Sequence, residues 1–169
     1  MREQRQPPRE PQAAREGVIL FRVGGFNFAI AAGAVKEIRG LEGLTIFNLG
    51  GIAAHLEKLK YTLERGGTTY FVVDAARHFD LKASTPGRVL ILRNSAAAVL
   101  VDSTDRMMEI SSLHALPRAF TNEEREWYRG LAVIDGEVVP VVNPGAFLNE
   151  EEQEVLRASL ERLRGAATA

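Results

Sequence analysis

The amino-acid sequence repeats itself at a shift of about 70 residues, and this repeat constrains the fold more than any other feature. Three pairs of segments match, at shifts of 69, 71 and 72 residues in turn: 67–79 with 136–148, 18–22 with 89–93, and 35–38 with 107–110. The repeat predicts two similar all-β halves in tandem, roughly residues 17–86 and 87–148. About five short strands in each half suffice for a small closed barrel, which leaves no free sheet edge.

Short runs of β-branched and aromatic residues, separated by glycine turns, locate the first strands. Residues 18–23 and 26–30 predict a hairpin, because a pair of glycines separates two runs that are rich in strand-forming residues. The second run alternates cleanly between apolar and other residues. We therefore expect Phe26, Phe28 and Ile30 on the buried face of this hairpin.

The rest of the first half predicts a further strand, a second hairpin and a short helix. Val35–Arg39 has the composition of a strand, whereas residues 52–59 favour a helix. Residues 61–63 and 68–73 flank a glycine-containing turn and predict the second hairpin. Asp74 follows directly and is expected to cap the N-terminus of a short helix.

The two ends of the chain differ from the repeated part. Residues 1–16 contain three prolines, four arginines and few apolar side chains, and are expected to form a disordered tail. Asn149 and Glu152 form a capping box, which predicts an amphipathic helix over residues 149–164. Its apolar face should pack on the chain's own barrel: Leu156, Leu160 and Leu163.

Composition excludes several classes of function. The net charge of −1 provides no extended basic surface for phosphates, so nucleic acid is not an expected partner. The chain has no cysteine, which excludes disulfides, thiolate metal sites and a cysteine nucleophile. No apolar run approaches the roughly 20 residues of a membrane helix, and the first residues do not resemble a secretory signal. We expect a cytoplasmic protein that does not insert into a membrane.

The sequence contains one cluster of residues with a resemblance to metal ligands, Asp74, His78 and Asp80. The simpler interpretation is a helix cap followed by a solvated helix face, because no second histidine follows at helical spacing. We therefore expect no metal site and no bound cofactor.

Ser111 and His114 place a hydroxyl group near an imidazole, but a serine nucleophile needs a base that a third group orients. Ser111 is better interpreted as the cap of a short helix before Pro117. The glycine pairs have none of the spacings of phosphate-binding loops and are interpreted as turns. We expect no catalytic residue and no enzymatic activity.

Several segments together resemble the CheW family of chemotaxis coupling proteins. The resemblance extends over nearly all of residues 17–163, and it depends on the order and spacing of these segments: 17–30, 34–40, 70–74, 99–102, 107–110, 129–132 and 147–149. Within it, Val35–Arg39 is similar to the family's V-x-E-I-R strand and residues 70–74 to its V-D-L strand. The resemblance implies two tandem five-stranded SH3-like barrels packed together, with short helices and a C-terminal helix.

The resemblance also implies a function as an adaptor between chemoreceptors and a CheA-type histidine kinase, recruited to receptor arrays at the membrane. By position, one set of residues would bind the cytoplasmic helical hairpin tip of the receptor: Val35, Glu37, Ile38, Arg39, Arg65, Gly66 and Met107. A second set would contact the kinase regulatory domain: Pro117, Arg118 and Phe120. Val35, Ile38 and Met107 are expected to form the apolar floor of a groove between the barrels.

The sequence departs from the family in one region. Residues 40–64 contain no proline, and residues 62–66 replace the family's N-L-R-G turn with one residue inserted before the arginine. An alternative function therefore stays open, a divergent CheW-like scaffold in gliding, pilus or developmental signalling that binds the kinase but not receptors. An enzyme or a nucleic-acid-binding barrel is the least favoured alternative.

Overall fold

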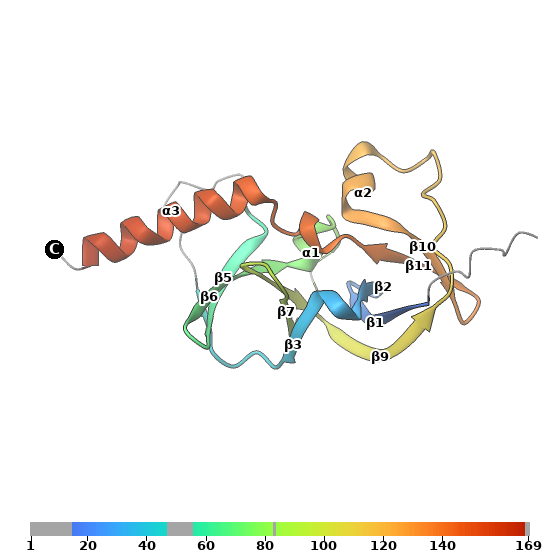
Figure 1. Ribbon diagram of the computed structural model, residues 1–169, viewed down its shortest axis with the longest axis horizontal. Helices are drawn as coiled ribbons and strands as arrows, with labels where there is room; N and C mark the ends of the chain where they lie inside the picture. Colours follow the sequence, from blue (N-terminus) through green and yellow to red (C-terminus); the bar gives the residue numbers. More distant parts are fainter. Residues whose placement is uncertain (1–14, 47–55, 83, 168–169) are drawn as a thin grey trace, which may run out of the picture.

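The computed structural model describes residues 15–46, 56–82 and 84–167 (Figure 1). Eleven strands lie in these residues: β1 Glu16–Val23, β2 Phe26–Ala31, β3 Val35–Arg39, β4 Leu44–Ile46, β5 Leu59–Arg65, β6 Thr68–Asp74, β7 Arg88–Leu92, β8 Ala97–Val101, β9 Ser103–Ile110, β10 Tyr128–Ile134 and β11 Glu137–Val142. Three α-helices and two 3-10 turns accompany them: α1 Ala75–His78, α2 Asn122–Trp127, α3 Glu150–Ala167, η1 Ala32–Ala34 and η2 Pro144–Ala146.

The strands form two sheets that exchange hairpins between the halves of the chain. Sheet 1 has the order β10-β11-β2-β1-β9, and sheet 2 has the order β3-β7-β8-β6-β5-β4. The hairpin β1–β2 of the first half thus pairs with strands of the second half, and β7–β8 pairs with strands of the first. The predicted boundary near residue 86 therefore does not separate the sheets, and sheet 2 has six strands where five were expected.

The sequence repeat is nevertheless visible in the pairing registers. The parallel pair Val72↔Ala98 in sheet 2 corresponds to Val141↔Ala29 in sheet 1, and in both cases the equivalent residues are 69 positions apart. The bulge at the start of β5, between Leu59 and Tyr61, recurs at the same shift between Tyr128 and Gly130 in β10. Each sheet is therefore built on the same plan from complementary parts of the two halves.

Each sheet closes into a barrel because the chain that leaves one edge strand pairs with the strands at the opposite edge. In sheet 2, β3 pairs with β7, and only residues 40–43 separate β3 from β4, which pairs with β5 through Thr45↔Thr62. In sheet 1, the chain after β9 forms the equivalent bridge, because the backbone N–H of His114 donates to the carbonyl of Leu131 at 2.8 Å. A Cβ on Gly130 would lie 2.6 Å from the carbonyl oxygen of His114, so this closure requires glycine.

Closure divides the apolar residues into two barrel interiors and one shared core. Equivalent positions fill the interiors: Val18, Leu20, Ala29, Ile110, Ala132, Ile134, Val139 and Val141 in sheet 1, and Leu63, Tyr70, Val72, Val89, Ile91, Ala98 and Leu100 in sheet 2. The shared core combines residues of both sheets, among them Phe21, Phe28 and Leu90. Because β8 faces an interior on one side and the shared core on the other, all five of its residues are apolar and buried.

The first hairpin is formed as predicted, but its burial differs at one position. Phe28 and Ile30 are buried in the shared core, whereas Phe26 is 59% exposed. Phe26 lies in the first pair after the turn, opposite Val23, which is fully buried in that core. The predicted burial of Phe26 is therefore wrong, although its partner across the hairpin is buried.

Local predictions for the second hairpin and its helix are confirmed. β5 and β6 pair as expected, and the carboxylate of Asp74 accepts a hydrogen bond from the backbone N–H of Ala76 at 3.1 Å. Of the predicted helix over residues 52–59, the first four positions lie outside the described residues. At its other end the prediction is wrong, because Leu59 is the first residue of β5.

The predicted tail of residues 1–16 overlaps the first strand by one residue. Residues 1–14 lie outside the described residues, but Glu16 is the first residue of β1 and pairs with Ile110. Its carboxylate accepts two hydrogen bonds from the guanidinium of Arg129, at 2.8 and 3.1 Å. These hydrogen bonds lower the pKa of Glu16 and raise that of Arg129. Glu16 therefore connects β1 to β10 instead of belonging to the tail.

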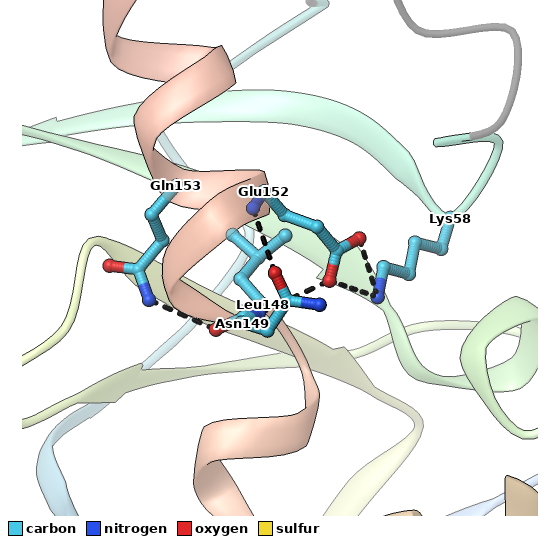
Figure 2. Close-up of polar contacts among 5 residues, drawn as sticks. All are labelled: Lys58, Leu148, Asn149, Glu152 and Gln153. Atoms are coloured by element: carbon cyan, nitrogen blue, oxygen red, sulfur yellow. Dashed lines mark hydrogen bonds and ion pairs between the residues drawn. The ribbon is translucent and has the colours of Figure 1, made fainter.

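The C-terminal helix begins with the expected capping box. The carboxamide oxygen of Asn149 accepts from the Glu152 N–H at 2.8 Å, and the Glu152 carboxylate accepts from the Asn149 N–H at 3.1 Å (Figure 2). α3 continues to Ala167, three residues past the predicted end at Arg164. Leu156 is fully buried in the shared core, and Leu160 is half-buried against it.

Polar contacts hold the start of α3 on sheet 2. Lys58, which precedes β5, forms an ion pair with Glu152 at 3.3 Å, as Figure 2 shows. The side-chain oxygen of Gln153 accepts from the N–H of Ala96 at 3.3 Å, and its nitrogen donates to the carbonyl of Leu148 at 2.9 Å. The helix then runs along sheet 2 and away from sheet 1 (Figure 1).

The equivalence of the two interiors predicts matched effects of core truncation. Val72→Ala and Val141→Ala should each lower the free energy of unfolding by about 1 to 3 kcal/mol, because both valines are fully buried. The double variant should show the sum of the two effects, since the residues occupy different interiors. Urea unfolding of the three variants checks this. A neutral effect at both positions would contradict the equivalence.

Candidate functional site

Strand β3 carries most of the candidate receptor-binding residues, and its pairing with β7 shows which way they face. Ile38 lies opposite Leu90, and Val35 lies opposite Leu92; both leucines belong to the shared core. Residues directly opposite each other in an antiparallel pair have their side chains on the same face of the sheet. Ile38 and Val35 therefore face the seam between the two barrels.

Val35 and Ile38 differ sharply in exposure. Ile38 is 43% exposed, but Val35 is only 7% exposed and belongs to the shared core. The expectation that Val35 forms part of an open groove floor is therefore wrong. Val35 follows directly after η1, where the chain enters the sheet, and its side chain is covered before any partner binds.

Met107 occupies the corresponding edge of sheet 1. It lies on β9 opposite Ile19, a residue of the shared core, so it too faces the seam. Its side chain is 67% exposed. The labels of β3 and β9 both lie along the lower side of the molecule in Figure 1. Ile38 and Met107 thus provide exposed apolar side chains from edge strands of different sheets.

The charged candidates of sheet 2 form one ion-pair cluster. The guanidinium of Arg65 donates two hydrogen bonds to the Glu37 carboxylate, at 3.1 and 3.2 Å, and Arg39 lies 3.8 Å from the same carboxylate. Arg65 comes from β5 and Glu37 from β3, which lie far apart in the order of sheet 2. The structure therefore brings together three residues predicted as a site, and the Glu37–Arg65 pair connects β3 with β5 across the closure of the barrel.

Gly66 lies in the exposed turn between β5 and β6. Its φ of 60° falls in the left-handed region, which favours glycine. A Cβ at this position would meet nothing within 4 Å. The structure thus explains Gly66 through the backbone of the turn, and the turn places Arg65 beside Glu37.

The candidate kinase-binding residues lie in the segment before α2. Pro117 and Arg118 are exposed, and the ring of Phe120 contacts Tyr128 edge-on at a centroid distance of 6.2 Å. The guanidinium of Arg125 donates to the carbonyl of Pro117 at 2.7 Å, which fixes this loop on α2. α2 lies at the top of the view in Figure 1, on the opposite side from β3 and β9.

The short helix predicted between Ser111 and Pro117 is absent, since these residues are described without helical structure. His114 forms the backbone bridge to Leu131 instead. The segment is extended because it closes the barrel of sheet 1, and a cap at Ser111 has no helix to begin.

His78 was expected on a solvated helix face, but it is only 8% exposed. Its ring packs against Phe79, Trp127 and Phe147, at centroid distances of 4.9, 5.7 and 4.8 Å. Burial, and secondarily the charge of Lys58, lower the pKa of His78 to about 3. This burial could not be predicted from the sequence, because α1 is a single turn that α2 and η2 cover from far along the chain.

Asp74 and Asp80 do not join His78 in a metal site. Asp74 caps α1 and pairs with Lys60 at 3.1 Å, while Asp80 is exposed. In residues 15–46, 56–82 and 84–167, no three acidic or histidine side chains are grouped so that they could hold a metal ion. The helices of this same part of the chain are all too short or too polar to cross a membrane.

The buried imidazole predicts that the protein loses stability in acid. A neutral His78 in the folded state and an ordinary pKa of 6.5 in the unfolded state give a contribution that is complete above pH 6.5. It is lost progressively as the pH falls from 6.5 toward 3. Between pH 7 and pH 5 this single group should lower the free energy of unfolding by about 2 kcal/mol.

Urea unfolding at pH 7 and pH 5 measures this contribution. His78→Phe should remove about 2 kcal/mol of the loss between the two pH values. His114→Gln, which changes an exposed histidine, should keep the loss unchanged. The same pH dependence in His78→Phe and in the unmodified protein would contradict the assignment.

Comparisons with known proteins agree on one family. A model of the family described as CheW-like domain matches residues 17–152. A probable chemotaxis protein CheW of Rhizobium etli is 24% identical over 150 residues, which cover 85% of this chain and 93% of the relative. The chemotaxis protein CheW of Rhizobium meliloti is 26% identical over 150 residues, covering 81% and 90%.

A solved structure supports the fold. The scaffolding protein TtCheW from Thermoanaerobacter tengcongensis superposes with a TM-score of 0.67 at 15% sequence identity, over 82% of this chain and 96% of that one. This likeness confirms the predicted all-β fold class of two packed SH3-like barrels with short helices and a C-terminal helix.

Proposed function

The chain belongs to the CheW-like domain family, and from this membership we propose that it is a non-enzymatic scaffold of chemotaxis signalling. In this proposal it works in the cytoplasm at receptor arrays, where it couples chemoreceptors to a CheA-type histidine kinase. The names of its relatives, a chemotaxis protein in two Rhizobium species and a scaffolding protein in Thermoanaerobacter tengcongensis, support this function.

The observation that carries the receptor half of the proposal is the exposure of two apolar side chains at the seam. Ile38 and Met107 face the shared core from edge strands of different sheets, yet both reach solvent. Glu37 precedes Ile38 on β3 but lies opposite Ile91 of the sheet 2 interior, so the Glu37–Arg65 pair provides charged groups on the other face of this strand. Apolar anchors with a polar rim are typical of specific protein interfaces of modest size. The helical hairpin tip of a receptor is the proposed occupant.

The kinase half of the proposal places the regulatory domain on the loop before α2. Pro117 and Arg118 are exposed there, and Phe120 presents a half-buried ring beside Tyr128. The hydrogen bond from Arg125 to Pro117 orders the loop in the free protein, which lowers the entropic cost of binding. The two proposed surfaces share no residue, and in this proposal both partners bind at the same time.

A charge reversal at Arg118 separates the two surfaces. Arg118→Glu should weaken kinase binding at least fivefold and leave receptor binding unchanged, because the side chain is exposed and lies only on the proposed kinase surface. Lys36→Glu, on β3, is the matched control, with unchanged kinase binding expected. Calorimetric titration with the kinase regulatory domain gives both values. Equal effects of the two variants would contradict the placement of the kinase surface.

Binding of the unmodified protein to each partner tests the proposal as a whole. Titrations with a receptor hairpin fragment and with the kinase regulatory domain should both give saturable binding. Kinase binding without receptor binding would favour a divergent scaffold in another signalling pathway. Binding to neither partner would contradict the proposed function.

A further inference from the structure

An open groove with a volume of about 880 Å³ lies where the helices of the two sheets meet. Its lining includes Arg77 and His78 of α1, Glu126 and Trp127 of α2, and Glu152 at the start of α3. None of the residues proposed to bind receptor or kinase lines it. The groove is therefore separate from those two surfaces.

The floor of the groove contains a polar group without a partner. His78 is more than nine-tenths buried, and no hydrogen bond of its imidazole is found among the described residues. Trp127 lies next to it, with ring centroids 5.7 Å apart and planes inclined by 47°. A neutral imidazole can both donate and accept, and an indole face attracts cations. The floor thus offers a hydrogen-bonding group and an aromatic surface to one ligand.

The rim of the groove has an excess of negative charge. The two cationic side chains on the rim already form ion pairs within the protein. Lys58 pairs with Glu152 at 3.3 Å, as Figure 2 shows, and Arg77 lies 3.9 Å from Asp74. Four exposed carboxylates on the rim have no ion-pair partner in the described part of the chain: Glu57, Asp80, Glu123 and Glu126. The groove is therefore complementary to a cation.

We propose that this groove binds arginine side chains from a basic segment of a partner protein. A guanidinium group is planar and weakly hydrated, so it can stack on Trp127 while its N–H groups reach His78 and the carboxylates of the rim. An ammonium group would satisfy the carboxylates but would stack less well. The volume of the groove leaves room for an extended peptide beside the bound side chain.

Fluorescence titration of the full chain tests this directly, because Trp127 is its one tryptophan. The probe is the peptide acetyl-Gly-Arg-Gly-Arg-Gly-amide, which should change the emission of Trp127 in a saturable manner. The same peptide with glutamine in place of arginine should cause no change. Equal responses to both peptides, or no response to either, would overturn the proposal.

Substitutions at two exposed residues show whether the rim carboxylates provide the affinity for the arginine peptide. Glu126→Gln should weaken binding of the arginine peptide at least threefold, and adding Glu123→Gln should weaken it further. Glu154→Gln removes an exposed carboxylate of α3 that does not line the groove, and it should leave the affinity unchanged. Equal losses in all variants would show nonspecific charge attraction and overturn the proposal.

A further experiment shows whether the groove binds arginines of the chain itself or those of a partner protein. Residues 1–14 contain Arg2, Arg5 and Arg9. A chain that lacks residues 1–14 should bind the peptide with the same affinity as the full chain. If peptide binding appears only after this deletion, the first residues of the chain occupy the groove, and the assignment to a partner protein is overturned.

Discussion

Ile38→Asp is expected to reduce the affinity for a receptor hairpin fragment at least a hundredfold without unfolding the protein. The side chain is 43% exposed in the free protein, so a carboxylate there stays hydrated until the receptor docks. Docking would then bury the charge without a partner, at a cost of several kcal/mol. A micromolar interaction, worth about 8 kcal/mol, cannot absorb this cost.

Ile46→Asp provides the matched control for this experiment. Ile46 is another exposed isoleucine, on β4 and outside the proposed receptor surface. The same substitution there should leave the receptor affinity and the melting temperature unchanged. Calorimetric titration gives the affinities, and circular dichroism confirms that both variants are folded. If Ile38→Asp and Ile46→Asp bind the receptor fragment equally well, the receptor surface is not at the seam.

Val35→Asp, three residues earlier on the same strand, is expected to prevent stable folding. Val35 is only 7% exposed in the shared core, so the change loses about 1.5 to 3 kcal/mol of apolar burial. A buried carboxylate without a partner adds several kcal/mol more. The total is comparable to the entire stability of a typical domain, roughly 5 to 15 kcal/mol.

Thermal unfolding followed by circular dichroism checks this expectation. Val35→Ala, a milder change, should keep the fold and lower the free energy of unfolding by about 1 to 3 kcal/mol. A folded Val35→Asp variant with an unchanged melting temperature would show that Val35 is accessible in solution. Val35 would then belong to the receptor surface together with Ile38, and its assignment to the shared core would be wrong.

The different roles of Val35 and Ile38 show where sequence-based prediction ends. Both residues are apolar, and pairing places both on the seam-facing side of β3. Their positions in the sequence do not show how far along β3 the side chains of sheet 2 are covered by the rest of the protein. That limit depends on the packing of whole sheets.

The exchange of hairpins between the sheets could not be predicted for a related reason. The sequence repeat makes β6 and β11 equivalent, and either could pair with β2 or with β8 through the same apolar pattern. A pattern that recurs in both halves indicates the pairing register, but it does not indicate which of the two equivalent strands is the partner. Asp74, in contrast, was predicted correctly as a cap because that interaction involves only the next two residues.

The candidate site shows the same division between local and long-range information. Glu37, Arg39 and Arg65 were grouped through the family resemblance, and the structure brings them together across the closure of sheet 2. The burial of His78 was not predicted, because the residues that cover it, Trp127 and Phe147, lie about 50 to 70 positions away in the sequence.

Co-sedimentation of the kinase with receptor-containing vesicles tests whether the protein couples the two partners. The full-length CheA-type kinase is incubated with the vesicles in the presence or absence of this protein and then centrifuged. Kinase should sediment in quantity only when the protein is present, and Ile38→Asp and Arg118→Glu should each reduce the amount that sediments. Kinase sedimentation that does not depend on the protein, or protein that never sediments with the receptors, would contradict its role as a coupling scaffold.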